Sequence, residues 1–400
     1  MIISVRSSEI LRIFPFGDIR NRLIVFLLFI TISKGVAQKA FKLKFQDWVE
    51  DDERIRVRSW YAEAGTSLTN GWEVGVVGMV DTITGSTPYG TPPTEDDNWL
   101  ATLEDERTAG LITLSKKHND YQFYFEYGLS DESDYLSRSY ATGISKGFAE
   151  DTLTLSGGFS YLDDEVDTSV TGVPGFGIQS RQTPEIFLGI QRILDPKTKF
   201  AFNLTYGRPE GYLSDPYRII EYPFIWFEGE PDEFKDLLYG AENRPNERET
   251  FAAYLEGVHM FKELDASTEL SYRYFSDDTD LSGHTFEFQW LQRFGDKFIL
   301  RPLFRHYIQN QADFYYLSLD GTGISYNDFP NGSAPYYSSD YRLSEFKANT
   351  YGLKLTYFHR LDLSFDLSYD RYEVTGTDGQ TDQRVYPDAG VLTLGFQWGF

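Results

Sequence analysis

The stretch LDLSFDLSYD, residues 361–370, carries an apolar side chain at every second position and a serine or aspartate between them. This period of two is the pattern of a β-strand with one apolar and one polar face. Residues 388–400 repeat it to the last position, and so do residues 121–130, 152–163 and 198–208. Helical periodicity is nearly absent along the chain, so we predict an all-β protein.

The polar faces of these strands favour a membrane barrel over a sandwich. A soluble sandwich buries its apolar rows between two sheets, whereas a wide membrane barrel turns them toward lipid and encloses polar rows in a lumen. Short turns also alternate with longer loops, as they do in barrels with short periplasmic turns. The short turns are expected at 68–71, 117–120, 149–151, 195–198, 262–265, 294–297 and 359–360. The long external loops are expected at 82–104, 164–182, 209–248, 310–342 and 375–387.

The number of strands follows from the same pattern. Counting back from Phe400 gives fifteen alternating segments, the first of them at 54–65. Bacterial single-chain barrels have an even number of strands and both termini in the periplasm, and residues 40–48 also alternate. We therefore predict that residues 38–400 form one transmembrane, antiparallel up-and-down β-barrel of about 16 strands, with 14 or 18 left open.

The first 37 residues have the features of a cleavable signal peptide. Four arginines precede an apolar core at 23–32, which is too short to span a bilayer. Small residues at 35–37 place the expected cleavage before Gln38. We therefore expect export to the outer membrane of a Gram-negative cell.

The composition limits the chemistry that the chain can carry. It has no cysteine, which excludes disulfides and thiolate sites. Its formal net charge of −24 argues against nucleic acid as a partner, because phosphates are bound by Lys and Arg. Aromatic residues make up 17% of the chain, which suits the interfacial girdles of a membrane barrel. Outer-membrane lipid and lipopolysaccharide are the expected surroundings, and no cofactor is expected.

Charged residues on the polar rows are the candidate functional residues. They are Arg56, Arg58, Arg273, Arg293, Arg301, Arg305, Glu73, Glu126, Glu287, Asp362, Asp366 and Asp370, all expected to face the lumen. One interpretation is a transverse electric field that orients and filters polar solutes. The other is a structural network of ion pairs that fills the interior.

Loop 209–248 is the longest of the expected connections. It contains the apolar run Tyr222–Phe227, and residues 232–238 are expected to form one or two helical turns. The loop either folds inward as a plug or constriction, or packs outside on its neighbours.

The last residues carry the expected assembly signal. Phe396, Trp398 and Phe400 share one face of a terminal strand. Barrel precursors commonly end in such a strand, which the barrel-assembly machinery reads by strand pairing.

No catalytic or metal site is predicted. The five histidines lack the spacing of a zinc site. Ser282 lies near His284, but a hydrolase also needs a third group that orients the base. The acidic runs at 50–53 and 94–98 lack the ligand spacing of an EF-hand, so solvated loops are favoured over calcium sites.

Several motifs resemble a family of outer-membrane barrels known only as a domain of unknown function. They are the acidic segment 50–57, the Asp-x-x-Thr-Gly-x-x-Pro turn at 81–88, the Pro-x-x-Arg element within 243–248, the segments 272–278 and 282–285, and the hairpin from Arg301-Pro302 to 312–315. The resemblance implies an outer-membrane barrel. Genes of the family often lie near those of small lipoproteins and of thioredoxin-like or flavin-transferase proteins. The resemblance therefore also implies an envelope assembly, with envelope lipoproteins as expected partners.

Together these features predict a porin-like barrel that passes small polar solutes or ions passively. The alternative is a plugged scaffold barrel that anchors envelope partner proteins. An outer-membrane hydrolase is a third, weaker hypothesis.

Overall fold

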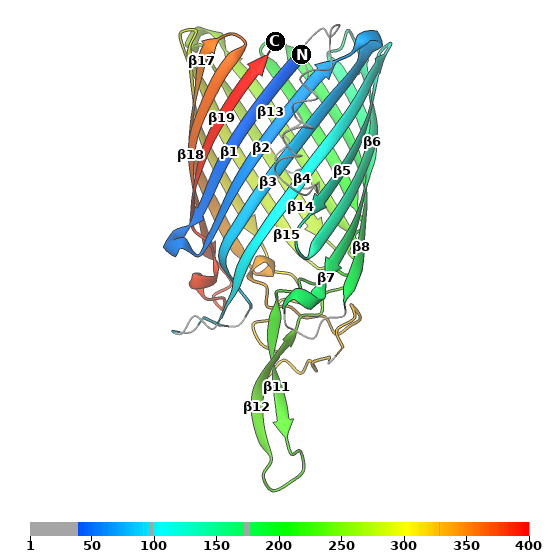
Figure 1. Cartoon of the computed structure of the whole chain (residues 1–400), viewed down its shortest axis with the longest axis vertical. Helices are drawn as coiled ribbons and strands as arrows, with labels where there is room; N and C mark the ends of the chain where they lie inside the picture. Colours follow the sequence, from blue (N-terminus) through cyan, green and yellow to red (C-terminus); the bar gives the residue numbers. More distant parts are fainter. Residues whose placement is uncertain are drawn as a thin grey trace.

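The computed structural model describes residues 39–90, 92–93, 95, 99–171, 177–327 and 329–399. These residues form a closed barrel of sixteen antiparallel strands (Figure 1), which confirms the predicted fold and strand number. The expected signal peptide and Phe400 lie outside the described residues. Within the described ranges, no helix is both long and apolar enough to cross a membrane.

The barrel strands follow one another around the wall in chain order. They are β1 (Lys39–Glu50), β2 (Ile55–Ser67), β3 (Trp72–Pro88), β4 (Leu100–His118), β5 (Tyr121–Asp131), β6 (Tyr135–Phe148), β7 (Leu153–Asp167), β8 (Ile178–Asp195), β9 (Thr198–Gly207), β13 (Thr250–Phe261), β14 (Ala266–Asp277), β15 (Ser282–Phe294), β16 (Phe298–Gln309), β17 (Phe346–Arg360), β18 (Leu363–Gly376) and β19 (Ala389–Gly399). The last strand closes the barrel by pairing with the first, from Ala40 beside Gly399 to Glu50 beside Ala389.

Shorter elements lie in the connections. They are β10 (Glu210–Gly211), which pairs with β8, the hairpin strands β11 (Ile219–Trp226) and β12 (Phe234–Ala241), and the 3-10 turns η1 (Asp51–Glu53), η2 (Thr69–Gly71), η3 (Thr168–Thr171), η4 (Lys262–Leu264), η5 (Tyr341–Leu343) and η6 (Gln383–Val385).

The outer face of the barrel is apolar. On β18, Phe365, Leu367 and Tyr369 are all exposed, whereas the residues between them point inward. The same row continues on its neighbours, where Leu367 pairs with Leu355 of β17 and Leu394 of β19. Exposing so much apolar surface to water would cost about 25 cal/mol per Å², so this face is the one that contacts lipid.

The two ends of the barrel differ. The short turns lie at the same end as the start of β1 and the end of β19, and the long connections lie at the other end (Figure 1). Asn70 and Gly71 take positive φ angles of 68° and 75° in the β2–β3 turn, which lets the chain reverse within a few residues. The positions predicted for the short turns agree with the structure.

Some long loops are shorter than the sequence indicates. β3 runs to Pro88 and pairs with β4 from Leu100 onward, so most of the expected loop 82–104 is strand. Thr82, Ile83 and Thr84 alternate and suit a strand, although the turn residues that follow indicate a loop. The wall at β3 and β4 therefore extends beyond the lipid-facing band.

The expected helical turn at 232–238 is wrong. These residues contribute to β12, which pairs with β11 from Ile219 opposite Ala241 to Trp226 opposite Phe234. Aromatic and aliphatic residues on both strands favour a hairpin over a helix. This hairpin projects away from the barrel along its long axis (Figure 1).

Candidate functional site

Strand register determines which charged side chains face the lumen. On β16, Phe304 is exposed on the outer face and pairs with Tyr351, whereas the next residue, Arg305, pairs with Thr350. Neighbouring residues of a strand point to opposite faces, so Arg305 faces the lumen, and Arg301 shares its row. Both predicted positions agree with the register.

The two strands before β16 add further charges to the inner face. Tyr272 of β14 pairs with Phe286 of β15 on the outer face, so the adjacent pair of Arg273 and Thr285 points inward. Glu287 lies opposite Arg305 on the same inner face. Arg293 is also on this row, near the periplasmic turn, where its Nε donates to the Gly295 carbonyl at 3.0 Å.

Two predicted acidic residues lie across the barrel from these arginines. Glu73 is on the inner row of β3, and Glu126 is on the inner row of β5. In the order of paired strands, β5 is eight strands from β16 in either direction, and β3 is eight strands from β14. Strands eight apart in a sixteen-stranded barrel lie on opposite walls. Arg273, Arg301 and Arg305 outnumber the neighbouring Glu287, and we call these three arginines the basic wall. We call Glu73 with Glu126 the acidic wall.

The aspartates of β18 divide between the lumen and a turn. Asp366 lies on the inner row, 3.0 Å from Lys354 Nζ, and accepts a hydrogen bond from Thr356 at 2.5 Å. Asp370 is on the same row. Asp362 precedes β18 and lies in the exposed short turn, where Arg360 is 3.2 Å away, so its predicted place on the lumen wall is wrong. β18 begins only at Leu363, so Asp362 belongs to the turn and not to the alternating strand.

The expected lumen position of Arg56 and Arg58 is also wrong. Both belong to the row of β2 that contains Trp60, which is 60% exposed on the outer face. Asp47 of β1 lies on this face and contacts Arg56 at 2.8 and 2.6 Å and Arg58 at 3.7 Å. Because Ile55 and Val57 are apolar, the sequence suggests that they face lipid and that Arg56 and Arg58 face the lumen. At this height the strand lies beyond the apolar band, so the alternation no longer indicates which face contacts lipid.

In the described part of the chain, the inner rows carry polar side chains at many positions, with apolar residues such as Ile299 and Leu303 between them. The three buried apolar clusters of this part of the chain lie in or beside the long connections, around Val385, Phe314 and Tyr337. Arg305, although inward, is exposed, so the lumen beside it has room for water. A cavity of about 160 Å³ lies there, lined by Arg305, Tyr307, Phe346, Ala348, Thr350 and Tyr372.

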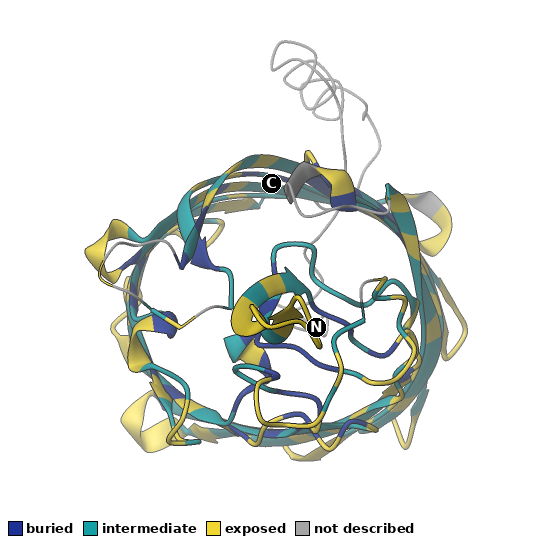
Figure 2. Cartoon of the chain, turned by 90° about the horizontal axis from the view of Figure 1, so that it is seen from below, coloured by how far each residue is buried: buried dark blue, intermediate teal, exposed yellow. Residues whose placement is uncertain are grey.

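Two long connections form a packed cap at the mouth of the lumen. The cap consists of residues 212–218 and 242–248 from the β9–β13 connection and residues 312–327 and 329–345 from the β16–β17 connection. Figure 2 views the barrel from this end and shows loops that reach over part of the opening. Asn243 joins the two connections, since its backbone N donates to Tyr337 O at 2.9 Å and its Nδ2 donates to Ser333 O at 2.7 Å.

Buried charges hold the cap together. Arg244 Nη2 lies 2.7 Å from Asp340 Oδ2, and its Nε lies 2.6 Å from Glu242 Oε1. Arg342 Nε donates to Asp340 Oδ1 at 2.9 Å. Burial by itself would raise the pKa of the Asp340 carboxyl, but three neighbouring guanidinium groups hold it well below its usual value. Asp340 is therefore an ionised acceptor at neutral pH. The two connections are held together by buried ion pairs and not by apolar contacts alone.

The cap is also attached to the barrel wall. Arg218 donates to the Pro88 carbonyl and, through Nη2, to Thr87 Oγ1 at 3.2 Å. Tyr217 donates its hydroxyl to Asp134 Oδ2 at 2.6 Å. Loop 209–248 thus differs from both arrangements left open by the sequence. Its ends cover part of the mouth, whereas its apolar middle forms a projecting hairpin that neither folds inward nor packs along its length on neighbouring loops.

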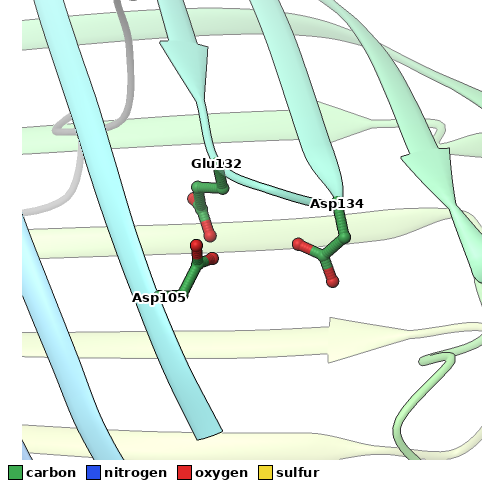
Figure 3. Close-up of side chains that lie close together, drawn as sticks. All are labelled: Asp105, Glu132 and Asp134. Atoms are coloured by element: carbon green, nitrogen blue, oxygen red, sulfur yellow. The ribbon is translucent and has the colours of Figure 1, made fainter. Parts of the chain in front are cut away.

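Three carboxylates lie together beside this attachment. Asp105 of β4, Glu132 and Asp134 each bring an oxygen to within 4.8 Å of the others (Figure 3). Oxygen ligands of this kind suit a hard divalent cation. Burial raises the pKa of Asp134, and the charges of Asp105 and Asp215 add to the effect, whereas the hydrogen bond from Tyr217 opposes it. The sequence does not reveal this cluster, because register and a loop bring its members together.

The acidic run at 50–53 has a different arrangement. Glu50 accepts from Arg54 Nε at 2.8 Å, and Asp51 accepts from both terminal nitrogens of Arg371 at 2.7 Å. These are ion pairs between neighbouring chain segments. Most of the run at 94–98 lies outside the described residues.

Three histidines lie on the outer face of the barrel strands. His284 Nδ1 is 2.8 Å from the Tyr272 hydroxyl, His306 Nδ1 is 2.7 Å from Asn349 Oδ1, and His259 Nδ1 is 2.9 Å from Thr198 Oγ1. Ser282 donates its hydroxyl to Asn310 Oδ1 at 3.0 Å. The partners found for Ser282 and His284 thus differ from those of a serine hydrolase.

Phe396 and Trp398, the two predicted assembly residues that the structure describes, lie at the closing seam. Phe396 pairs with Leu43 and Trp398 pairs with Phe41, all on the outer face. The Phe396 ring also lies 5.5 Å from the Phe365 ring of β18. The seam therefore contains a lipid-facing aromatic row that links the two ends of the chain.

A family model described as "Protein of unknown function (DUF3570)" matches residues 95–398. The chain belongs to this family. The match covers all of the barrel strands from β4 to β18 and most of β19, together with the cap. No curated protein matches the chain.

The DUF3570 barrel also resembles solved outer-membrane proteins at low identity. CdiB from Acinetobacter baumannii matches 90% of this chain at 11% identity, with a TM-score of 0.49, and the chain spans 60% of that protein. OmpT of Vibrio cholerae matches 91% of the chain at 9% identity, with 97% of OmpT covered and a TM-score of 0.42. OpdK from Pseudomonas aeruginosa matches 91% at 8% identity, with 98% of OpdK covered and a TM-score of 0.42.

Proposed function

We propose that this chain is an outer-membrane channel that passes small polar solutes or ions passively. The observation that carries the proposal is the position of the basic wall opposite the acidic wall. A sixteen-stranded barrel is wide enough for an aqueous lumen unless it is plugged. The outward apolar rows support insertion in a bilayer, and the expected signal peptide supports the outer membrane.

Charges on opposite walls would act on a solute as a transverse field. A dipolar solute that enters between Arg305 and Glu126 would orient with its negative end toward the arginine. An ion would instead follow the wall of opposite sign, so selectivity depends on the difference between the two walls. The field is strongest where water is scarce, because its dielectric screening is then reduced.

The cap would limit the size of solutes that reach this field. It covers part of the mouth and is held by buried ion pairs, so it is expected to narrow the entrance (Figure 2). The lumen charges would then act on solutes that have passed the cap. Size selection and charge selection would occur at different depths.

A scaffold barrel is the second candidate. The buried apolar clusters and the ion network at the mouth favour it, because a rigid cap could close the lumen and support partner proteins. We propose no enzymatic activity for either arrangement.

Conductance of the purified protein in planar bilayers tests the proposal. A channel gives steady steps and a reversal potential that shifts in a salt gradient. If neither the intact protein nor a variant with a loosened cap conducts, the channel is excluded and the scaffold is favoured.

A further inference from the structure

The β11–β12 hairpin exposes an apolar surface far from the lipid-facing band. It projects beyond the cap, away from the barrel wall (Figure 1). Near its tip, Phe227 is 56% exposed and Phe234 is 50% exposed, and their rings lie 6.4 Å apart. Phe224, Ile225, Trp226 and Leu237 are also exposed. Contiguous exposed apolar side chains of this kind mark interaction surfaces in soluble environments.

An isolated two-stranded ribbon is also marginally stable in water. The base of this hairpin is supported, because Tyr222 stacks on Tyr326 with ring centroids 3.8 Å apart and Ile220 is fully buried. In the described chain, the outer half pairs only within the hairpin, from Pro223 opposite Leu237 to Trp226 opposite Phe234. A third strand would therefore stabilise this half.

The two edges of the hairpin differ in their ability to accept a strand. Beside β11, Leu319 N donates to Glu221 O at 2.8 Å, so the base of this edge is covered. Further out, Pro223 has no N–H to donate. The edge of β11 is therefore poor in free backbone donors.

The edge of β12 is open. Leu237, opposite Pro223, donates its backbone N–H to the side chain of the preceding Asp236 at 2.9 Å, so this N–H points away from β11. An added strand would displace the Asp236 carboxylate from this donor. In an antiparallel pair the backbone groups alternate between the partner and the free side. Lys235 and Tyr239 therefore also present their backbone groups to the free side. These three positions form a template for an added strand.

The negative charge at the tip of the hairpin determines which kind of extended segment can bind beside β12. Residues 228–233, between the two strands, contain Glu228, Glu230, Asp232 and Glu233 and no basic residue. Lys235 is 2.5 Å from Asp320, so its charge is already paired. A segment with basic side chains would meet the acidic tip, and its cations could also stack on the exposed aromatic rings.

We propose that β12 binds an extended, basic and apolar segment of another protein as a third strand of the hairpin. Main-chain hydrogen bonds to the β12 edge provide affinity, and the acidic tip and aromatic cluster provide the preference for alternating basic and apolar residues. The external location of this surface rests on the membrane orientation in the proposed function. The binding itself does not require the barrel to conduct.

A synthetic peptide of alternating Lys and Val tests the inference against the intact, detergent-solubilised protein. Fluorescence anisotropy of the labelled peptide measures affinity. We expect Leu237→Pro to weaken binding at least tenfold. This change removes an N–H that β11 does not use, so the hairpin should persist. A Glu-Val peptide and a Lys-Val peptide interrupted by proline should bind at least tenfold more weakly than the Lys-Val peptide.

Phe329→Ala is the matched control, because it removes an exposed aromatic ring from a neighbouring loop and should leave peptide affinity unchanged. Phe234→Ala should weaken binding in the same assay. Equal binding by the Leu237→Pro variant, equal binding of the Glu-Val peptide, or occupation of the hairpin by a second copy of this chain would each overturn the proposal. Conductance measured on the same preparations separates failure of this inference from failure of the channel.

Discussion

Arg244 donates from Nη2 to Asp340 Oδ2 at 2.7 Å and thereby joins the β9–β13 connection to the β16–β17 connection. Both side chains are almost fully buried, and Asp340 also accepts from Arg342. Breaking one member of a buried ion pair typically costs about 3–5 kcal/mol, because the remaining charges lose their compensation. This contact is therefore a good point at which to test the role of the cap.

Asp340→Asn should loosen the cap without unfolding the barrel. The change leaves Arg244 and Arg342 buried with less negative charge, at a local cost of about 3 kcal/mol. We expect faster proteolysis within 212–248 and, for a channel, larger conductance steps. Asp320→Asn is the control, since its pair with Lys235 is solvent-exposed and worth less than about 1 kcal/mol. A cap equally resistant to protease in both variants would contradict this role.

The cap should tolerate moderate acidity. The pKa of Asp340 is held well below its ordinary value of 3.8, so its ionised form stabilises the cap. This contribution is fully present above the ordinary value and is lost as pH falls through the lower folded-state pKa. Burial raises the pKa of Glu242 in the same network, so protonation of Glu242 removes a penalty and does not weaken the cap. Protease resistance of the cap should therefore not fall between pH 7 and about pH 4 and should decrease only in stronger acid. A loss centred near pH 6 would show that another group controls the cap.

Asp134→Asn should stabilise the external end of β5 and β6 at neutral pH. Burial raises the pKa of Asp134, so its charged form destabilises the folded state. The pH dependence of this contribution to stability is opposite to that of Asp340. The cost of the charged Asp134 carboxylate is absent at low pH and appears as pH rises through its raised pKa. We expect the unfolding temperature to rise by about 2 °C at pH 7 and to be unchanged near pH 3. Asparagine still accepts the hydrogen bond from Tyr217, which isolates the effect of charge.

Calcium should have the same effect on the unmodified protein if the three carboxylates bind it. Millimolar calcium would then raise the unfolding temperature, and chelation would reverse the shift. The response should disappear in the Asp134→Asn variant, where one ligand charge is lost.

The double variant Arg301→Gln/Arg305→Gln should change ion preference. Neutralising these two residues leaves the acidic wall dominant, so the reversal potential in a salt gradient should shift toward cation selectivity. Glu73→Gln/Glu126→Gln should shift it in the opposite direction. The control is Arg58→Gln, which removes the same charge from the outer face and should leave selectivity unchanged. Identical reversal potentials in all variants would exclude the transverse field.

Phe396→Ala should weaken the closing seam. Phe396 pairs with Leu43 and contacts Phe365 across the last two strands, and such aromatic contacts contribute about 1 kcal/mol each. We expect slower assembly and a lower temperature for loss of the compact barrel band on semi-native gels. Leu188→Ala is the comparison, because it removes an exposed apolar side chain from β8, on the wall opposite the seam.

Several features of the candidate site could be predicted from local alternation. Arg301, Arg305 and Glu126 lie inside as expected, because apolar neighbours on the lipid-facing row set the phase of their strands. For Arg56 and Arg58 the alternation predicts the lumen, whereas the structure places them on the outer face. They lie near the loop-connected end of β2, where the alternation no longer indicates contact with lipid. The correct signal was Trp60, whose side chain marks the outer row where β2 enters the apolar band.

The sequence by itself determined the barrel and its end-to-end polarity, because each depends on a local period of two and on turn residues next to it in the chain. It indicated about 16 strands, and the closed sheet fixed that number. Tertiary structure alone decided that Arg244 meets Asp340, that three carboxylates gather beside Tyr217, and that basic and acidic walls face each other. These contacts join residues from different loops or opposite strands. Closure of the sheet sets their distances, and no local pattern in the chain encodes that closure.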